Sequence, residues 1–93
     1  MTRVLLRSSA FIHTARKLIN RQPNLAMELQ TTLELLSADA FHPHLKTHKL
    51  KGDLHDSWAC SINYYLRIVF RFVKYNENEA ILLESIGSHE EVY

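Results

Sequence analysis

The chain has 93 residues, of which 46% are hydrophobic and 23% charged, and its formal net charge is +1. These values predict one globular domain over residues 1–93 and argue against disorder and against a second domain. The sequence shows no apolar run near the ~18 residues of a membrane span and no signal-peptide core, so we expect a cytoplasmic protein without membrane contact. The single cysteine, Cys60, agrees with a reducing compartment.

The N-terminal part of the chain predicts a strand followed by two helices. Residues 3–6 form a short strand-like run, and Ser8 and Ser9, which follow it, are good helix N-caps. Apolar residues then recur at helical spacing: Phe11, Ala15, Leu18 and Ile19. Pro23 suits the first turn of a second helix, which carries its own apolar stripe: Leu25, Leu29, Leu33 and Leu36. The first helix is amphipathic, and we interpret the leucine stripe of the second as core packing in preference to a partner-binding groove.

The C-terminal part predicts three strands, at residues 57–63, 66–73 and 80–86, after a loop over residues 37–45. Their connections are short and polar, so the strands should pair antiparallel and the element order should be βααβββ. In the middle strand Leu66, Ile68, Phe70 and Phe72 alternate with Arg67, Val69 and Arg71. One face should therefore enter the core, and the two arginines should share the other face.

Charge is distributed unevenly along the chain. Residues 1–27 contain basic residues and no acidic ones, residues 76–93 contain five glutamates and no Lys or Arg, and the segment "HPHLKTHKLK" holds three histidines and three lysines without an acid. Such clusters are typical of a nucleic-acid-binding surface, but an ordinary solvated surface explains them equally well.

The sequence predicts no metal site and no cofactor. His42, His44 and His48 have spacings unlike a metal-binding pair and no accompanying carboxylates, and there is no glycine-rich phosphate loop.

Several of the remaining polar side chains suit metal-free RNA cleavage: His48, Lys49, Lys51, Arg67, Arg71, His89 and Tyr93. In this reaction the ribose 2′-hydroxyl attacks phosphorus, so the site needs a base, a cation for the transition state and an acid for the leaving oxygen. Taken alone, the same residues also fit solvated arginines and structural histidines.

Three sequence pieces together resemble the RelE/ParE toxin superfamily. They are His48-x-Leu50-x-Gly52, the strand Leu66-Arg67-Ile68-Val69-Phe70, and the terminal Ile86-Gly87-x-His89-x-x-Val92-Tyr93. The resemblance covers most of the chain and is strongest to the YafQ-like branch. It implies an α+β fold in which an N-terminal helical hairpin packs on a curled, mainly antiparallel sheet. It also implies a ribosome-dependent endonuclease that cuts messenger RNA, and an antitoxin encoded by an adjacent gene.

The resemblance assigns roles to individual residues. His48 and His89 match histidines of YafQ-like members, Arg67 matches a strand arginine of RelE-like members, and Tyr93 matches a terminal aromatic position that stacks on a base or assists proton transfer. Lys49 and Lys51 fall where basic residues of the family contact RNA. Lys46 of the same basic segment and Arg71 of the middle strand complete the predicted RNA contacts. The sequence does not decide which histidine is the base.

One departure from the family pattern keeps other readings open. YafQ-like members often carry a further His and an Asp near the second strand hairpin, where this chain has Ser61 and Tyr65. The alternatives are a non-enzymatic ParE-like toxin that binds DNA gyrase, or an attenuated relative that only binds its antitoxin. Separate acid, base and phosphate-binding groups argue against the first alternative, because a binding protein has no chemical need for them.

Overall fold

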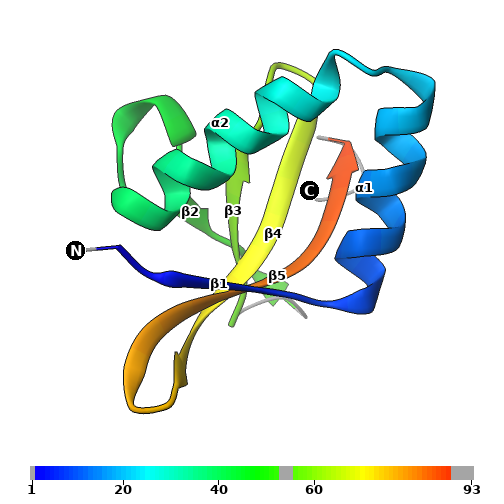
Figure 1. The fold of residues 1–93 in the computed structure, drawn as a ribbon. Helices are drawn as coiled ribbons and strands as arrows, with labels where there is room; N and C mark the ends of the chain where they lie inside the picture. The colour runs from blue at the N-terminus through cyan, green and yellow to red at the C-terminus, as the bar shows by residue number, and fades with distance from the viewer. Residues whose placement is uncertain (1, 53–55, 89–93) are drawn as a thin grey trace.

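The computed structural model describes residues 2–52 and 56–88, which form two helices on one face of a curled sheet (Figure 1). The elements follow in the order β1 (Val4–Arg7), α1 (Ser9–Arg21), α2 (Leu25–Ala38), the 3-10 helix η1 (Pro43–Leu45), β2 (His48–Lys49), β3 (Trp58–Ser61), β4 (Leu66–Tyr75) and β5 (Asn78–Ser88). None of the helices in these ranges is long and apolar enough to span a membrane.

The predicted α+β fold and its element order are confirmed, with one addition. The sheet has the strand order β1-β5-β4-β3-β2, in which β1 pairs parallel with β5 and the other neighbours pair antiparallel. The added element is β2, which has only two residues and lies in a segment without strand-like alternation. Such a short strand exists only because β3 offers it a pairing edge.

The helix boundaries follow from local signals. Ser8 caps α1, since its Oγ accepts a hydrogen bond from the backbone N–H of Phe11 at 3.1 Å. The same hydroxyl donates to the carbonyl oxygen of Glu84 at 2.9 Å, which ties the start of α1 to β5. The leucine stripe predicted for the second helix is buried as expected, at Leu25, Leu29, Leu33 and Leu36.

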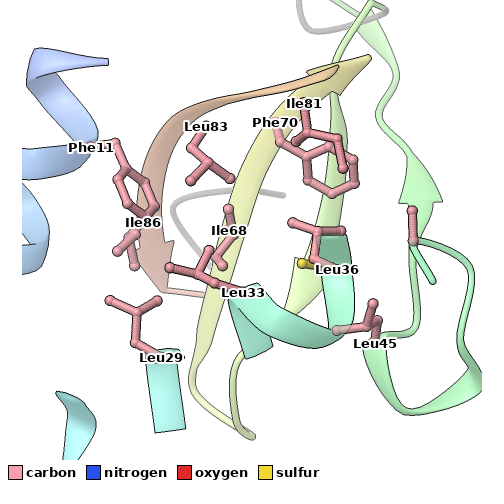
Figure 2. Packing of buried hydrophobic residues seen from close by; sticks show 12 residues of the cluster. Phe11, Leu29, Leu33, Leu36, Leu45, Ile68, Phe70, Ile81, Leu83 and Ile86 are labelled. Carbon is pink, nitrogen blue, oxygen red and sulfur yellow. The ribbon is translucent and has the colours of Figure 1, made fainter. Parts of the chain in front are cut away.

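The core lies between the helices and the sheet (Figure 2). Phe11 of α1 packs against Ile68 and Phe70 of β4, both 0% exposed, together with three leucines of α2: Leu29, Leu33 and Leu36. Leu66 and Phe72 pack against the same cluster while remaining partly exposed, so the predicted core face of β4 is confirmed. On the opposite face of the sheet, Leu50, Ala59 and Val69 form a second, smaller buried cluster.

A bulge in β5 changes which of its side chains enter the core. Val69 pairs with Ser85 and Phe70 with Leu83, so Glu84 is an extra residue between two ladder positions. Ile81 and Leu83 enter the core before the bulge, and Ile86 does so after it. The bulge therefore keeps three apolar side chains inside, although their spacing breaks the strict alternation of a strand.

Candidate functional site

Strand register places three predicted site residues on the sheet face that points away from the helices, which we call the outer face. His48 pairs with Ala59 and Ala59 pairs with Val69, and cross-strand partners lie on the same side of a sheet. Arg67 and Arg71 flank Val69 on β4 and share its face. The backbone of His48 on β2 is thus two inter-strand spacings, roughly 10 Å, from β4. Along the strands it is in register with Val69, midway between Arg67 and Arg71.

The backbone around His48 determines which ring nitrogen holds the proton. The imidazole Nδ1 lies 2.9 Å from the carbonyl oxygen of Lys46, and a carbonyl can only accept. Nδ1 therefore donates, and in the neutral ring the lone pair is on Nε2. The left-handed backbone of Lys46, with φ of 52°, forms part of the turn that presents this carbonyl to His48. An exposed imidazole oriented in this way can accept a proton through Nε2.

The guanidinium of Arg67 is held by the β3–β4 hairpin. Its Nη1 donates to the carbonyl oxygens of Asn63 at 2.7 Å, Leu66 at 3.1 Å and Tyr64 at 3.2 Å. These acceptors are neutral, and within residues 2–52 and 56–88 no carboxylate forms an ion pair with Arg67. The side chain is therefore oriented, and its positive charge has no carboxylate partner among these residues, which suits the binding of a phosphate.

Arg71 differs from Arg67 because it has an acidic partner. Its Nε lies 3.5 Å from Oε1 of Glu84, and the hydroxyl of Ser57 donates to the same oxygen at 2.7 Å. Ser57 is 1% exposed, so this hydrogen bond is shielded from water. Sequence reasoning missed both partners. The sequence did offer one signal for Glu84: the adjacent polar residues Glu84 and Ser85 interrupt the alternation of β5, and such an interruption indicates the bulge at which Glu84 lies.

The predicted RNA-contacting lysines are not on one face of the sheet. Lys49 pairs with Trp58, on the side opposite to His48, while Lys46 belongs to the turn before β2. Lys46, Lys49 and Lys51 are all exposed. The structure therefore groups His48 with Arg67 and Arg71 and spreads the lysines around the β2 edge. The other two predicted catalytic residues, His89 and Tyr93, lie outside the described residues.

The hairpin residues that depart from the family pattern lie beside Arg67. Ser61 is its register partner on β3, and Tyr65 is an exposed residue of the loop. On the other side, Gly87 of β5 pairs with Arg67 and precedes His89 by two positions in the sequence.

Cys60 does not contribute a nucleophile to this face. The thiol is on the core side of β3 and is 0% exposed. Burial raises the pKa of Cys60 from its ordinary 9.0 to about 12, although a backbone hydrogen bond with Ile68 and the charge of Arg67 act in the opposite direction. The thiol therefore stays protonated near neutral pH, and a protonated thiol is a poor nucleophile.

The described residues contain no group of three or more His, Cys, Asp or Glu side chains placed to hold a metal ion. His42 and His44 stack on each other, with ring centroids 5.0 Å apart, and Nδ1 of His42 accepts from the backbone N–H of His44. The expected absence of a metal and of a cofactor stays a prediction.

Solved toxin structures share this fold over nearly the whole chain. The YoeB/ParE toxin from Agrobacterium tumefaciens has a TM-score of 0.74 at 16% identity, covering 92% of this chain and 98% of its own. The DinJ-YafQ toxin-antitoxin complex from E. coli gives a TM-score of 0.75 at 15% identity, with coverage of 100% and 99%. A metal-bound toxin from Helicobacter pylori gives a TM-score of 0.73 at 25% identity, with full coverage of both chains.

These similarities define a class of protein: a small α+β domain with two helices on a mixed, curled sheet. The chain has the same fold as these toxins, in agreement with the α+β fold that the resemblance in the sequence implies. No family model and no curated protein matches the sequence.

Proposed function

We propose that this chain is the toxin of a type II toxin–antitoxin system, which cleaves messenger RNA on the ribosome in the cytoplasm and thereby inhibits translation. The observation that carries the proposal is that Arg67 is oriented by hairpin carbonyl oxygens, has no carboxylate partner among the described residues and lies on the same sheet face as His48. A phosphate-binding cation and a proton-transfer group on one surface are what metal-free cleavage requires. The shared fold of solved toxins supports the same conclusion.

In the proposed reaction each residue has a distinct task. Nε2 of His48 accepts the proton of the 2′-hydroxyl as it attacks phosphorus, because Nδ1 is already protonated and bound to Lys46. The guanidinium of Arg67 stabilises the charge that develops on the phosphate oxygens. His89 protonates the leaving 5′-oxygen, and Tyr93 stacks on a base or assists this proton transfer. The exchange of protons needs no metal and no cofactor.

The exposed lysines extend the proposed RNA surface beyond the reacting phosphate. Lys46, Lys49 and Lys51 surround the β2 edge, where they can contact the backbone of the message or of ribosomal RNA. Arg71 also contributes, but it must first exchange its contact with Glu84 for one with a phosphate. Its contribution to binding should therefore be smaller than that of a free arginine.

The second candidate is an attenuated relative that binds its antitoxin without cutting RNA. Two observations favour it: Ser61, one of the two departures from the YafQ-like pattern, is the register partner of Arg67, and Glu84 forms an ion pair with Arg71. A ParE-like toxin that binds gyrase shares the fold, but it has no need for the oriented His48 and Arg67.

The proposed partner is an antitoxin encoded by an adjacent gene, with a DNA-binding part and a C-terminal segment that folds as a helix on this chain. A groove of about 820 Å³ runs between α1, α2 and β1 and offers such a segment apolar anchors and basic rims. The solved DinJ-YafQ toxin-antitoxin complex, which has a similar fold, supports an antitoxin partner. The residues that line the groove include Leu5, Phe11, Ile19, Leu29, Arg7 and Arg16.

Mapping cleavage of a defined message on translating ribosomes tests the proposed function. The purified protein should cut the message at discrete positions, and addition of the purified neighbouring gene product should suppress cleavage, with association slowed by salt. An intact message combined with tight binding of the neighbour would favour the attenuated relative. Inhibition of gyrase supercoiling with an intact message would favour the ParE-like alternative. A neighbour that binds tightly and leaves cleavage unchanged would refute the account of neutralisation.

A further inference from the structure

Two adjacent tyrosines project from the hairpin that holds Arg67. Tyr64 is 83% exposed and Tyr65 is 72% exposed, whereas Phe11, Trp58, Phe70 and Phe72 pack in or against the core. Their ring centroids lie 5.2 Å apart with an interplanar angle of 82°. The rings therefore do not cover each other, and the pair forms a corner with one ring face beside the edge of the other ring.

The backbone beneath this corner is fixed by Asn63. Its side-chain Oδ1 accepts hydrogen bonds from the backbone N–H groups of Tyr65 and Leu66, both at 2.9 Å. Its Nδ2 donates to Oε2 of Glu28 at 3.3 Å, which connects the hairpin to α2. A ring on a fixed backbone loses little conformational entropy when a ligand stacks on it.

A cation lies at the base of the same corner. Nη1 of Arg67 donates to the carbonyl oxygen of Tyr64, the residue that carries one of the two rings, and to that of Asn63. Exposed aromatic rings next to an arginine are the combination with which proteins bind single-stranded nucleic acid, since the rings take bases and the cation takes the backbone.

We propose that Tyr64 and Tyr65 form a stacking subsite for one unpaired nucleobase of the RNA whose phosphate is bound by Arg67. This inference rests on the proposed function and adds to it the nucleobase contact that positions the RNA. The base stacks on one ring and contacts the edge of the other. Every base has a stacking face, so the subsite tolerates all four bases and favours the larger purines.

The subsite can be tested on the isolated protein with a fluorescein-labelled single-stranded RNA heptamer and fluorescence anisotropy. Tyr64→Ala and Tyr65→Ala should each weaken binding by about 5- to 150-fold, the range for loss of one stacked base. Tyr64→Phe and Tyr65→Phe should bind within about twofold of the unmodified protein, because the ring is kept. Tyr75→Ala is the matched control, since Tyr75 is 48% exposed at the other end of β4 and should not alter binding.

A set of heptamers with one abasic position each identifies the base as the partner of the rings. One abasic position should weaken binding to the unmodified protein as much as the alanine substitution does, and it should cause no further loss in the alanine variants. Equal losses of the variants for intact and abasic RNA would overturn the inference. So would alanine variants that bind RNA normally but lose the antitoxin, because the corner would then be a protein-docking surface.

Heptamer binding and ribosomal cleavage, measured on the same proteins, separate this inference from the proposed function. Alanine variants that bind RNA and cleave ribosomal messages like the unmodified protein would refute the subsite and leave the nuclease standing. An unmodified protein that cleaves messages but binds none of the heptamers would do the same. An unmodified protein that neither binds RNA nor cleaves would refute both.

Discussion

Replacement of Arg67 by alanine is the most direct test of the candidate site. The substitution removes the guanidinium and, with it, the three hydrogen bonds from Nη1 to carbonyl oxygens of the hairpin. If Arg67 stabilises the charge on the phosphate, cleavage on ribosomes should fall by ~10²-fold or more. The loss should affect the chemical step, because the interaction strengthens as charge develops in the transition state.

The expected cost in stability is small enough to keep the protein folded. Each hydrogen bond contributes about 0.5–1.5 kcal/mol, and water can replace Arg67 at the exposed carbonyl of Tyr64. Asn63 continues to hold the turn through Tyr65 and Leu66. The free energy of unfolding should therefore fall by about 1–3 kcal/mol. Urea denaturation monitored through the fluorescence of Trp58 measures this change.

Two further variants make the comparison sharper. Arg67→Lys keeps the charge but loses the planar fork, so its activity should lie between that of alanine and arginine. Arg71→Ala removes the same side chain from the same strand face, but from a position where Glu84 already balances the charge. It should cost less activity than Arg67→Ala. Single-turnover cleavage at saturating protein is the assay. A folded Arg67→Ala variant with near-normal cleavage would exclude Arg67 from the site.

Three other predictions concern Glu84, Cys60 and the independence of cleavage from a metal ion. Glu84→Gln should lower the free energy of unfolding by about 1–2 kcal/mol, because it weakens the contacts with Ser57 and Arg71. RNA binding should become tighter, because Arg71 no longer has an acidic partner in Glu84. Unchanged urea midpoints and RNA affinity would contradict this prediction. Burial raises the pKa of Cys60 to about 12, so the stability that the protonated thiol contributes is complete below pH 9 and is lost from pH 9 towards pH 12. The free energy of unfolding should fall by up to about 1.4 kcal/mol per pH unit in that window. Cys60→Ala should lack this pH dependence between pH 8 and 10.5, and equal slopes for the two proteins would refute the assignment. Cleavage should survive excess EDTA in a single-turnover assay corrected for loss of ribosomal magnesium, whereas restoration by zinc alone would mean that the loop histidines are ligands.

Local signals in the sequence were sufficient for most elements of the fold. The cap at Ser8, the leucine stripe of α2 and the alternation of β4 each act over a few neighbouring residues, so they can be recognised without knowledge of the rest of the chain. The same alternation predicted that Arg67 and Arg71 share a face, and the register confirms it.

Tertiary structure alone decided how the site is assembled. The two-residue β2 forms because β3 is beside it, and this pairing brings His48 to the face of Arg67 while turning Lys49 away. The bulge lies at Glu84, which contacts Arg71, whereas Arg67 has no carboxylate partner in the part of the chain that the structure describes. These features depend on residues that are far apart in the sequence, such as Arg71 and Glu84 or Glu28 and Asn63. Periodicity reports which face a side chain occupies, but only the packed sheet determines which charges meet on that face.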